Sequence, residues 1–599
     1  MKRSGRKKIG AGFWIVFVLS MLLFAAVLEL SKNTLWGWGL FLLSGAAFLF
    51  VRSKLKKAGY WHGWIAAVCR VGFAAVLLLD LWITAPPFRA VPAVDGKTGG
   101  ETPVVTVKQG DLTGVFTADG EVAVYAGIPY AAPPVGDLRW KEPQPAPAWE
   151  GVRECDSYAP MAMQKRSSPL YDSLTQLLGT HNYVFSLKDN YREPMSEDCL
   201  YLNVWAPILH TDEPLPVLFF IHGGSLMTGQ SHYTEYRGED LARQGVIVVN
   251  MGYRLGVFGF FADEELAAES PNGTTGNYGL LDQICALAWV RDNIAAFGGD
   301  PGNVTLAGES AGAACVTALC TSPLAKGLFR RVIAESSTTT AKTPTHSFRS
   351  LEDALQAGKK TRERLGVSSL AELRSLPAEK IVDELNAHHH LTVDGYALTE
   401  TPYASYQKGQ FNEEARLHGF NLEESGPFLL FGQATLKNYA GYVRALLGSE
   451  QGERFLKAFP AATDAEAQKL WADLYSAYYF SYGHYRWEQQ AKENGVPSYE
   501  YLFSKHNGRL GCWHSGEEIY FYGNIPAGSR LFRSDDRELS RVMSAYFVQF
   551  VKTGNPNGDG LPEWPANTGA DGRLLVLDEQ VRLGDDPFLP FYDFIEQAE

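Results

Sequence analysis

The residues best suited to do chemistry are five consecutive ones, Gly308-Glu309-Ser310-Ala311-Gly312. They follow a β-rich run at residues 303–307 and precede a run of small residues at 313–316. Gly-x-Ser-x-Gly between a strand and a helix is typical of a sharp turn that exposes a serine hydroxyl at a helix N-terminus. Glycine-rich turns with a serine also occur by chance, but the flanking strand and helix favour a nucleophile. Ser310 is therefore the candidate nucleophile of an acyl-transfer reaction.

A second candidate element, His222-Gly223-Gly224-Ser225, ends the apolar run 215–221. Acyl transfer builds negative charge on the carbonyl oxygen of the substrate, and preset backbone N–H groups near that oxygen stabilise it. Glycines free the backbone to aim those groups. Taken alone, the segment could be an ordinary turn that ends a strand. Together with the serine turn, it indicates an oxyanion hole.

Apolar runs at 215–221 and 246–250 are continuous rather than alternating, which is typical of strands buried on both faces of a parallel sheet. A helical period follows over 278–297, and further strands are expected at 303–307 and 331–335. This order of strands and helices predicts an α/β fold with a mostly parallel sheet covered by helices.

The flanking segments predict smaller elements. Short β-rich runs at 104–107, 114–117 and 122–126 are typical of hairpins, and residues 350–384 are helical and charged. A late helix is expected over 535–551, with Asp535 as its N-cap, Glu538 three residues on and Gly554 beyond its end.

Residues 104–593 resemble the type-B carboxylesterase/cholinesterase family. The resemblance implies the α/β-hydrolase fold and an enzyme that cleaves carboxylic esters through an acyl-enzyme intermediate, with no cofactor and no metal. Besides the two glycine segments, the matching stretches are Gly-Ile-Pro-Tyr-Ala at 127–131, the run at 197–204, Tyr-Arg-Leu-Gly at 253–256, and the unbroken run 276–312.

The resemblance also implies a Ser–Glu–His triad, in the chain order of this fold. The family's acid segment corresponds here to residues 419–425 and points to Glu424, and its histidine segment corresponds to residues 512–523 and points to His514. In these roles His514 takes the proton of Ser310, and Glu424 fixes the tautomer of the imidazole.

The oxyanion hole implied by the resemblance consists of the backbone N–H groups of Gly224, Ser225 and Ala311. Ser225 stands where the family has a third glycine. It keeps the N–H group but restricts the backbone more than glycine does.

The head of the chain holds three apolar runs, at about 9–30, 35–51 and 64–85. The first could be a signal peptide, but no small-residue cleavage site follows it, and two further runs do, so three transmembrane helices fit better. The loop expected between the second and third runs carries Arg52, Lys54, Lys56 and Lys57, whereas the loop between the first two carries only Lys32. The positive-inside rule then predicts a cytoplasmic N-terminus and an extracytoplasmic catalytic domain in the cell membrane.

The predicted organisation is a membrane anchor at 1–85, a linker at 86–103 and a carboxylesterase domain at 104–599. The whole chain has a net charge of −13 at pH 7, and because residues 1–85 contribute +9, the remainder carries −22. Such a surface repels phosphate backbones, which argues against nucleic-acid binding. The expected partners are a small-molecule ester and a lipid bilayer; the oligomeric state stays open.

Two alternatives stand beside the ester hydrolase. A thioesterase or amidase could use the same triad, because pocket shape and not the triad selects the leaving group. A non-catalytic cholinesterase-like binding ectodomain is the other, but such domains typically lose the serine, whereas Ser310, Glu424 and His514 are all present.

Other candidate sites carry weaker signals. The seven cysteines show no CxxC or Cys/His zinc spacing, and their pairing cannot be read from the sequence. The triple histidine at 388–390 is expected to lie in a solvated loop. Arg70 and Asp80 lie near the ends of the third apolar run, where they are expected to reach the interface and serve a structural role.

Overall fold

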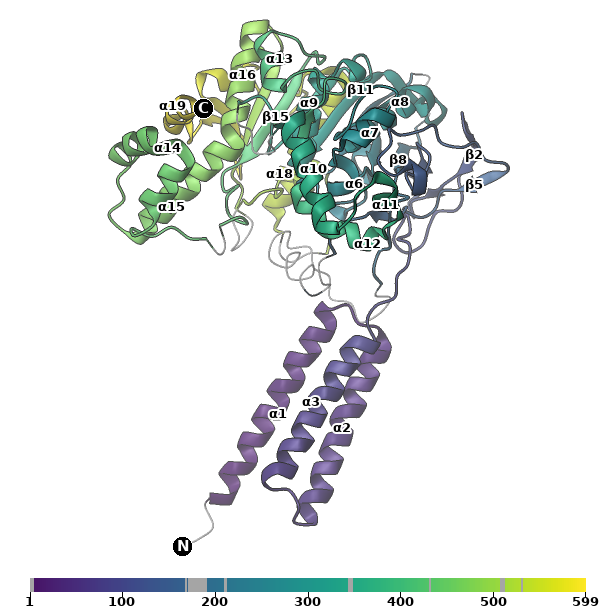
Figure 1. Ribbon diagram of the computed structural model, residues 1–599, viewed down its shortest axis with the longest axis vertical. Coiled ribbons are helices and arrows are strands. Elements are labelled where there is room, and N and C mark those ends of the chain that lie inside the picture. The colour runs from purple at the N-terminus through teal and green to yellow at the C-terminus, as the bar shows by residue number, and fades with distance from the viewer. Residues whose placement is uncertain are drawn as a thin grey trace. The chain divides into compact units, whose positions relative to one another are not determined.

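The structure is a computed structural model of the 599-residue chain. It describes residues 5–166, 170, 191–209, 213–342, 348–429, 432–506, 512–528 and 532–599. The chain forms two compact units, which Figure 1 shows. The first comprises Met1–Ala90 and Arg166–Pro194, and the second comprises Val91–Lys165 and Met195–Glu599. We call them the helical unit and the hydrolase unit.

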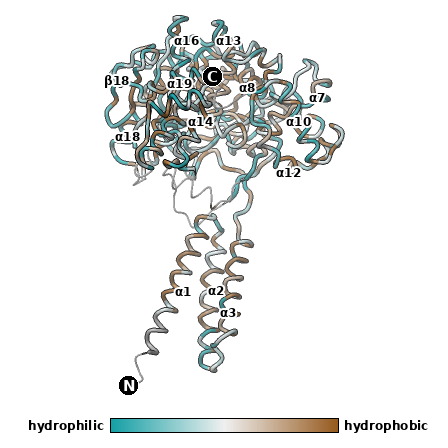
Figure 2. The backbone as a smooth tube through the Cα atoms, turned by 60° about the vertical axis from the view of Figure 1, so that its left-hand side comes forward, coloured by the Kyte–Doolittle hydropathy of each residue, from teal (hydrophilic) through white to brown (hydrophobic). Residues whose placement is uncertain are grey.

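The helical unit contains three long apolar helices, α1 (Gly5–Leu30), α2 (Leu35–Lys57) and α3 (Gly63–Ile83). Each is long and apolar enough to cross a bilayer, which confirms the prediction of three apolar helices. Large apolar side chains such as Trp36 and Trp82 are more than three-quarters exposed, and Figure 2 shows these helices as largely hydrophobic. Apolar side chains in this arrangement suit a lipid environment rather than water.

The predicted loop after the second apolar run begins later than expected. Arg52, Lys54, Lys56 and Lys57 all lie within the last turns of α2, so the prediction that they form a loop is wrong. Basic side chains are favourable in the last turn of a helix, because they face the negative end of its dipole. Their long stems also allow the charged ends to reach the membrane surface.

One end of the helical unit is joined by polar side chains. The amide Nδ2 of Asn33 donates to Leu81 O and to Thr84 Oγ1, each at 2.9 Å, and Thr84 Oγ1 donates to Asp80 O at 2.7 Å. These bonds tie the α1–α2 turn to the end of α3. Asp80 is buried beside Thr84 rather than extended toward the interface, whereas Arg70 is exposed.

The hydrolase unit is built on a sheet that has eleven strands among the described residues, in the order β18-β17-β16-β15-β12-β11-β9-β10-β8-β4-β3. The strands from β17 to β10 are parallel, and the edges β18, β8, β4 and β3 pair antiparallel. In chain order the strands are β3 (Val115–Phe116), β4 (Val122–Pro129), β8 (Tyr201–Pro207), β9 (Leu215–Ile221), β10 (Ile247–Met251), β11 (Gly299–Glu309), β12 (Arg331–Glu335), β15 (Arg416–Asn421), β16 (Ser498–Phe503), β17 (Arg573–Leu577) and β18 (Arg582–Asp585).

Helices pack on this sheet, as Figure 1 shows, which confirms the predicted α/β-hydrolase fold. The helices of the hydrolase unit are α5 (Glu239–Arg243), α6 (Gly256–Phe260), α7 (Glu264–Glu269), α8 (Tyr278–Asn293), α9 (Ala311–Thr321), α10 (Leu351–Leu365), α11 (Leu370–Ser375), α12 (Ala378–Ile381), α13 (Pro402–Gln407), α14 (Tyr439–Ala458), α15 (Asp464–Ser476), α16 (Tyr482–Asn494), α17 (Glu518–Phe521), α18 (Ser534–Thr553) and α19 (Leu589–Ala598). Those that contact the strands of the large sheet are α5, α8, α9, α16 and α18. Smaller sheets join β1 (Val105–Val107), β2 (Gly110–Thr113) and β5 (Val152–Glu154), then β6 (Met161–Ala162) with β7 (Met195–Ser196), and β13 (Phe348–Ser350) with β14 (Leu391–Val393).

The continuous apolar runs form the buried central strands, because parallel strands are covered on both faces. The expected strands 215–221 and 331–335 coincide with β9 and β12, whose central residues are fully buried. The expected helix 278–297 is α8 followed by a 3₁₀ turn, and Gly298, with φ 85°, ends it. The hydropathy pattern therefore predicted the positions of β9, β12 and α8.

Two local predictions are wrong. The helix α18 begins at Ser534, and the N–H of Arg533 donates to Asp536 Oδ2 at 2.7 Å, so Asp535 is not its N-cap. The helix does end at Gly554, where φ is 82°. His388 is fully buried rather than solvated, with Nε2 2.8 Å from Thr361 Oγ1, because α10 packs over it.

Candidate active site

Ser310 lies on the sharp turn between β11 and α9. Its φ of 53° and ψ of −123° are unusual for a residue with a side chain. The turn is held from both sides, because the N–H of Ser310 donates to Glu335 O at 2.8 Å and its carbonyl accepts from Ala314 N at 3.0 Å. The strained conformation places the hydroxyl at the start of α9, as the motif predicts.

The glycines of the motif are required by the close approach of α9 to the sheet. A Cβ at Gly312 would lie 2.0 Å from the carbonyl oxygen of Ile221, at the end of β9. A Cβ at Gly308 would lie 2.6 Å from the backbone of Gly312. Backbone atoms cannot move aside as a flexible side chain can, so only glycine fits at these two positions.

Three side chains from separate parts of the chain meet at this turn. His514 Nε2 lies 2.9 Å from Ser310 Oγ, and His514 Nδ1 lies 2.6 Å from Glu424 Oε2. The other carboxylate oxygen of Glu424 accepts from the N–H of Asn421 at 2.8 Å. Glu424 is fully buried, and both of its oxygens are hydrogen-bonded. The structure thus brings together the three residues that the sequence predicts as a triad.

The acid and the histidine come from two loops that are joined to each other. Glu424 follows β15, and His514 lies between β16 and α17. Asn421 Nδ2 donates to Trp513 O at 2.8 Å. The N–H of Glu423 donates to Cys512 O at 3.3 Å. These contacts fix the imidazole and the carboxylate relative to each other.

The predicted oxyanion segment passes directly against the serine. A Cβ at Gly223 would lie 3.0 Å from Ser310 Cβ. Gly224 has φ 97°, and Ser225 has φ 56°, in the left-handed region that favours glycine. Ser225 therefore follows the backbone path of the glycine that it replaces. Ala311 is the first residue of α9, where an N–H group has no partner within the helix.

The site contains buried carboxylates that the sequence analysis did not predict. Glu309 Oε1 lies 3.4 Å from His514 Nε2 and accepts from Ser515 Oγ at 2.6 Å. Glu517 accepts from Ser336 Oγ and from Asn421 Nδ2, each at 2.5 Å. Glu335 and Glu518 interact with these two acids, and all four are at most 5% exposed.

Burial and mutual repulsion raise the pKa values of these carboxyl groups. Burial, followed by the charges of Glu424 and Glu309, raises the pKa of Glu517 to about 8. Burial lowers the pKa of His514, but the charges of Glu309 and Glu424 outweigh that effect and raise the pKa to about 9. Glu309 sits inside the serine motif, yet nothing in the local sequence signals that Glu335 and Glu517 are buried.

Aromatic side chains border the imidazole. The ring centroids of Phe428 and Phe480 lie 5.4 Å and 4.9 Å from that of His514. Phe428 is about half exposed, whereas Phe480 is buried. The approach to His514 is therefore apolar on this side.

The cysteines take no part in disulfide bonds. All seven lie in the described ranges and all are free thiols, including Cys155 and Cys199 in the hydrolase unit. Burial raises the pKa of Cys155 to about 12. The stability of this unit thus depends on its core and hydrogen bonds.

A mostly parallel sheet with a serine on its strand–helix turn, joined to a buried histidine and acid, defines a serine hydrolase of the α/β-hydrolase class. The sequence profile described as "Carboxylesterase family" matches residues 101–595. The chain belongs to the carboxylesterase family.

The relatives agree with this assignment. Fumonisin B1 esterase of Sphingopyxis macrogoltabida is 32% identical over 548 residues, which cover 87% of this chain and 94% of the relative. Fatty acyl-CoA hydrolase precursor, medium chain, of Anas platyrhynchos is 32% identical over 538 residues, 84% of this chain and 92% of the relative. A crystal structure of a carboxylesterase of Geobacillus stearothermophilus has a TM-score of 0.69 and 31% identity, and it covers 81% of this chain and 98% of that chain.

These matches confirm the predicted family, fold and enzyme class. The protein is a serine hydrolase that cleaves carboxylic esters. The individual roles of Ser310, Glu424 and His514, and of the oxyanion donors, stay predictions.

Proposed function

We propose that Ser310 is the nucleophile, His514 the general base and acid, and Glu424 the group that orients the imidazole. The observation that carries this proposal is the pair of contacts from His514, 2.9 Å to Ser310 Oγ and 2.6 Å to Glu424 Oε2. The Ser310 proton passes to His514 Nε2 as Oγ attacks the ester carbonyl, and the alcohol leaves with that proton. Water then attacks the acyl-enzyme. His514 accepts the proton of that water and returns it to Ser310 Oγ as the acid leaves.

The backbone N–H groups of Gly224, Ser225 and Ala311 are proposed to stabilise the oxyanion. The close approach of the segment to Ser310 supports this role, because a Cβ at Gly223 would lie only 3.0 Å from Ser310 Cβ. Neither a cofactor nor a metal enters this mechanism; the hydroxyl, the imidazole and the amide groups perform each step.

The experiment that tests the nucleophile is labelling with a fluorophosphonate, which forms a bond between serine Oγ and phosphorus while fluoride leaves. The protein should be labelled once, and Ser310→Ala should abolish both labelling and hydrolysis of a chromogenic ester. Ser449→Ala, at an exposed position of α14, is the matched control and should keep both. Ester hydrolysis by Ser310→Ala at the rate of the control would refute the proposed mechanism.

We further propose that the preferred substrates are oxygen esters with an apolar group. The rings of Phe428 and Phe480 beside His514 support an apolar acyl or alcohol part. Thioesters are the second candidate, because one relative is named a fatty acyl-CoA hydrolase. An oxygen ester, a thioester and an amide with the same acyl chain would separate these candidates by their kcat/KM values.

The third proposal concerns location. Residues 1–85 form a multi-pass anchor, 86–103 a linker, and 104–599 a domain on the extracytoplasmic side. The charge asymmetry supports this topology, because Arg52 and three lysines end α2, whereas only Lys32 lies between α1 and α2. Protease added to intact cells should release an active fragment. Protection of the hydrolase unit in intact cells, with cleavage after permeabilisation, would show the opposite orientation.

A further inference from the structure

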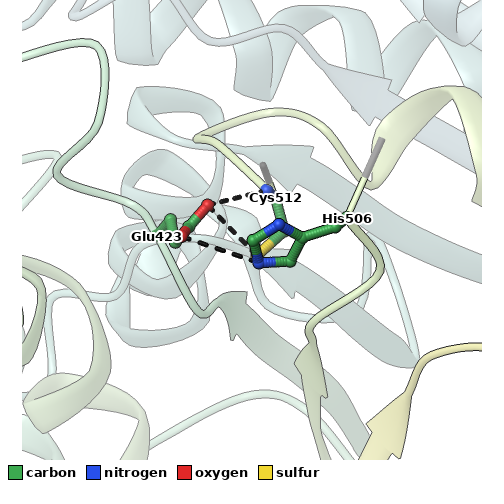
Figure 3. A group of neighbouring side chains, drawn as sticks. All are labelled: Glu423, His506 and Cys512. Carbon is green, nitrogen blue, oxygen red and sulfur yellow. Dashed lines mark hydrogen bonds and ion pairs between the residues drawn. The ribbon is translucent and has the colours of Figure 1, made fainter. Parts of the chain in front are cut away.

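Three side chains beside the triad carry atoms that bind transition metals. Glu423, His506 and Cys512 converge so that one carboxylate oxygen, one imidazole nitrogen and the sulfur all lie within 4.8 Å of one another (Figure 3). Glu423 Oε1 lies 3.6 Å from His506 Nε2, and Glu423 Oε2 lies 3.8 Å from Cys512 Sγ.

These separations suit a tetrahedral ion. Ligand bonds of about 2.0–2.3 Å at tetrahedral angles place the ligand atoms about 3.3–3.7 Å apart. The two separations above start from different oxygens of Glu423, and the three ligand atoms lie within 4.8 Å of one another, so rotation of the Glu423 and His506 side chains would bring them to this spacing.

The main chain already holds two of the three ligands. The N–H of Glu423 donates to Cys512 O at 3.3 Å, and the N–H of Cys512 donates to Glu423 Oε2 at 3.1 Å. A backbone bridge also pairs Glu423 with Trp513. The third ligand, His506, has a side chain that is 58% exposed, so it can turn toward an ion at low cost. Two preset ligands and one adjustable ligand reduce the ordering that binding requires.

The charge around the thiol favours a cation. Glu423 and Glu424 face Cys512, and Asp473 lies near Glu423, with Lys469 paired to Asp473. Burial, and then the charge of Glu423, raises the pKa of the Cys512 thiol above its ordinary range. The thiol is therefore neutral without a metal, and an arriving cation meets a site with acidic groups on several sides.

We propose that Glu423, His506 and Cys512 form a zinc site that joins the loop of Glu424 to the loop of His514. Mixed sulfur, nitrogen and carboxylate ligands suit Zn²⁺, whereas Ca²⁺ and Mg²⁺ require more oxygens. Binding breaks the Cys512 S–H bond, forms a sulfur–zinc bond and releases the proton to solvent. Three protein ligands leave a fourth position for water or another solvent ligand.

The consequence for the enzyme is mechanical. Glu423 immediately precedes Glu424, and Cys512 is two residues before His514. An ion bound to both loops resists their separation, so zinc stabilises the native arrangement of the acid and the base. This site is independent of the proposed mechanism, since neither Ser310 nor His514 is a ligand.

The test uses the full chain in detergent, stripped with a chelator and titrated with Co²⁺, whose thiolate complexes absorb in the near ultraviolet. One Co²⁺ per chain should produce this absorption, and Zn²⁺ should displace it and raise the melting temperature Tm. Cys512→Ser should lose the absorption. Loss of a residue that only hydrogen-bonds to a metal ligand typically lowers metal affinity by roughly 10–100-fold. Because His506 is proposed to be a ligand itself, His506→Ala should weaken Co²⁺ binding by more than that.

Matched controls keep the result interpretable. Cys285→Ser removes a partly buried thiol and His62→Ala an exposed histidine, both outside the site, and both should bind Co²⁺ as the wild type does. Ser310→Ala should also bind Co²⁺ normally, which separates this proposal from the catalytic one. Absence of the absorption in the wild type would overturn the zinc site. So would its persistence in Cys512→Ser, or unchanged affinity in His506→Ala, whose exposed side chain is not needed for folding.

Discussion

The nucleophile and its two partners are held in place by different means. Ser310 is positioned mainly by consecutive residues, because β11, the turn and the start of α9 lie within one short stretch, and its N–H group donates to Glu335 O on the neighbouring strand. Glu424 and His514 are 90 residues apart and are fixed by side-chain hydrogen bonds between two loops. The first arrangement is encoded locally and is rigid at the backbone, whereas the second depends on tertiary contacts. Substitutions in the two regions should therefore fail in different ways.

The largest effect should follow from breaking the loop pair at its acid. Glu424→Gln should lower kcat by about 10³–10⁴-fold with the fold intact, because an amide at this position stabilises the wrong tautomer of His514. Steady-state kinetics with a chromogenic ester, in buffer with a chelator, measures the loss. Glu423→Gln is the neighbouring control and should cost about tenfold or less. The reverse outcome, with Glu423→Gln inactive and Glu424→Gln active, would assign the acid to the adjacent residue.

This contrast also explains what could be predicted from the sequence. The Ser310 turn is visible in five residues with their flanking strand and helix, so the residues alone indicated it. Thirteen histidines and many acids offered no comparable pattern, and His514 and Glu424 were selected only through the family resemblance. Contacts that span 90 residues have no local period that a single sequence displays.

The predictions that were wrong or missing concern features that are set by side-chain contacts rather than by a local hydropathy pattern. His388 and the carboxylates of Glu335 and Glu517 are polar side chains that are usually exposed, and only the packing of α10, β12 and α17 buries them. The N-cap of α18 depends on which side chain accepts a hydrogen bond from the first free N–H groups of the helix. A hydropathy pattern contains no information about that hydrogen bond. The strands and the three long apolar helices were predictable, because their hydropathy alone specifies burial or lipid contact.

The next largest effect should come from breaking the serine turn at its backbone. Gly312→Ala places a Cβ 2.0 Å from Ile221 O, and the strand cannot move without disturbing the sheet. We expect destabilisation at the upper end of the roughly 1–3 kcal/mol of an overpacked site, together with loss of fluorophosphonate labelling. Gly441→Ala is the matched control, since nothing lies within 4 Å of that position in α14, and it should be neutral or stabilising by up to about 1 kcal/mol. A fully labelled, stable Gly312→Ala would show that the turn tolerates a side chain.

The acid cluster beneath the loops should make stability fall as pH rises. The pKa of Glu517 is raised from 4.5 to about 8, so between these values the folded state keeps a proton that the unfolded state has lost. Its stabilisation is complete below about pH 4.5 and declines by at most about 1.4 kcal/mol per pH unit up to about pH 8. The groups that face Glu517 are Glu309, Glu335, Glu424, Glu518, His514 and Tyr501.

Tm measured from pH 5 to pH 8 tests this expectation. The difference in Tm between the wild type and Glu517→Gln should change with pH across this window, because the amide does not titrate. Glu538→Gln is the control: Arg541 lowers the pKa of this exposed carboxyl, which is therefore ionised in both states above pH 5. Parallel pH profiles for the wild type and Glu517→Gln would mean that Glu517 is ionised in the folded protein.

The smallest effect should come from the side-chain hydrogen bond that supplements the His514–Ser310 contact between the two regions. Ser515, next to His514, donates to Glu309 Oε1, and that oxygen lies 3.4 Å from His514 Nε2. Removing a hydrogen bond of this kind costs about 0.5–1.5 kcal/mol, so Ser515→Ala should lower kcat/KM by up to about tenfold. Because Ser515 has φ 65°, Ser515→Gly removes the same hydroxyl while relieving the backbone. Equal losses of kcat/KM in the two variants, with a higher Tm for the glycine, would assign the effect to the hydrogen bond. Full activity in Ser515→Gly would instead show that the serine turn and the loops need no side-chain link at this point.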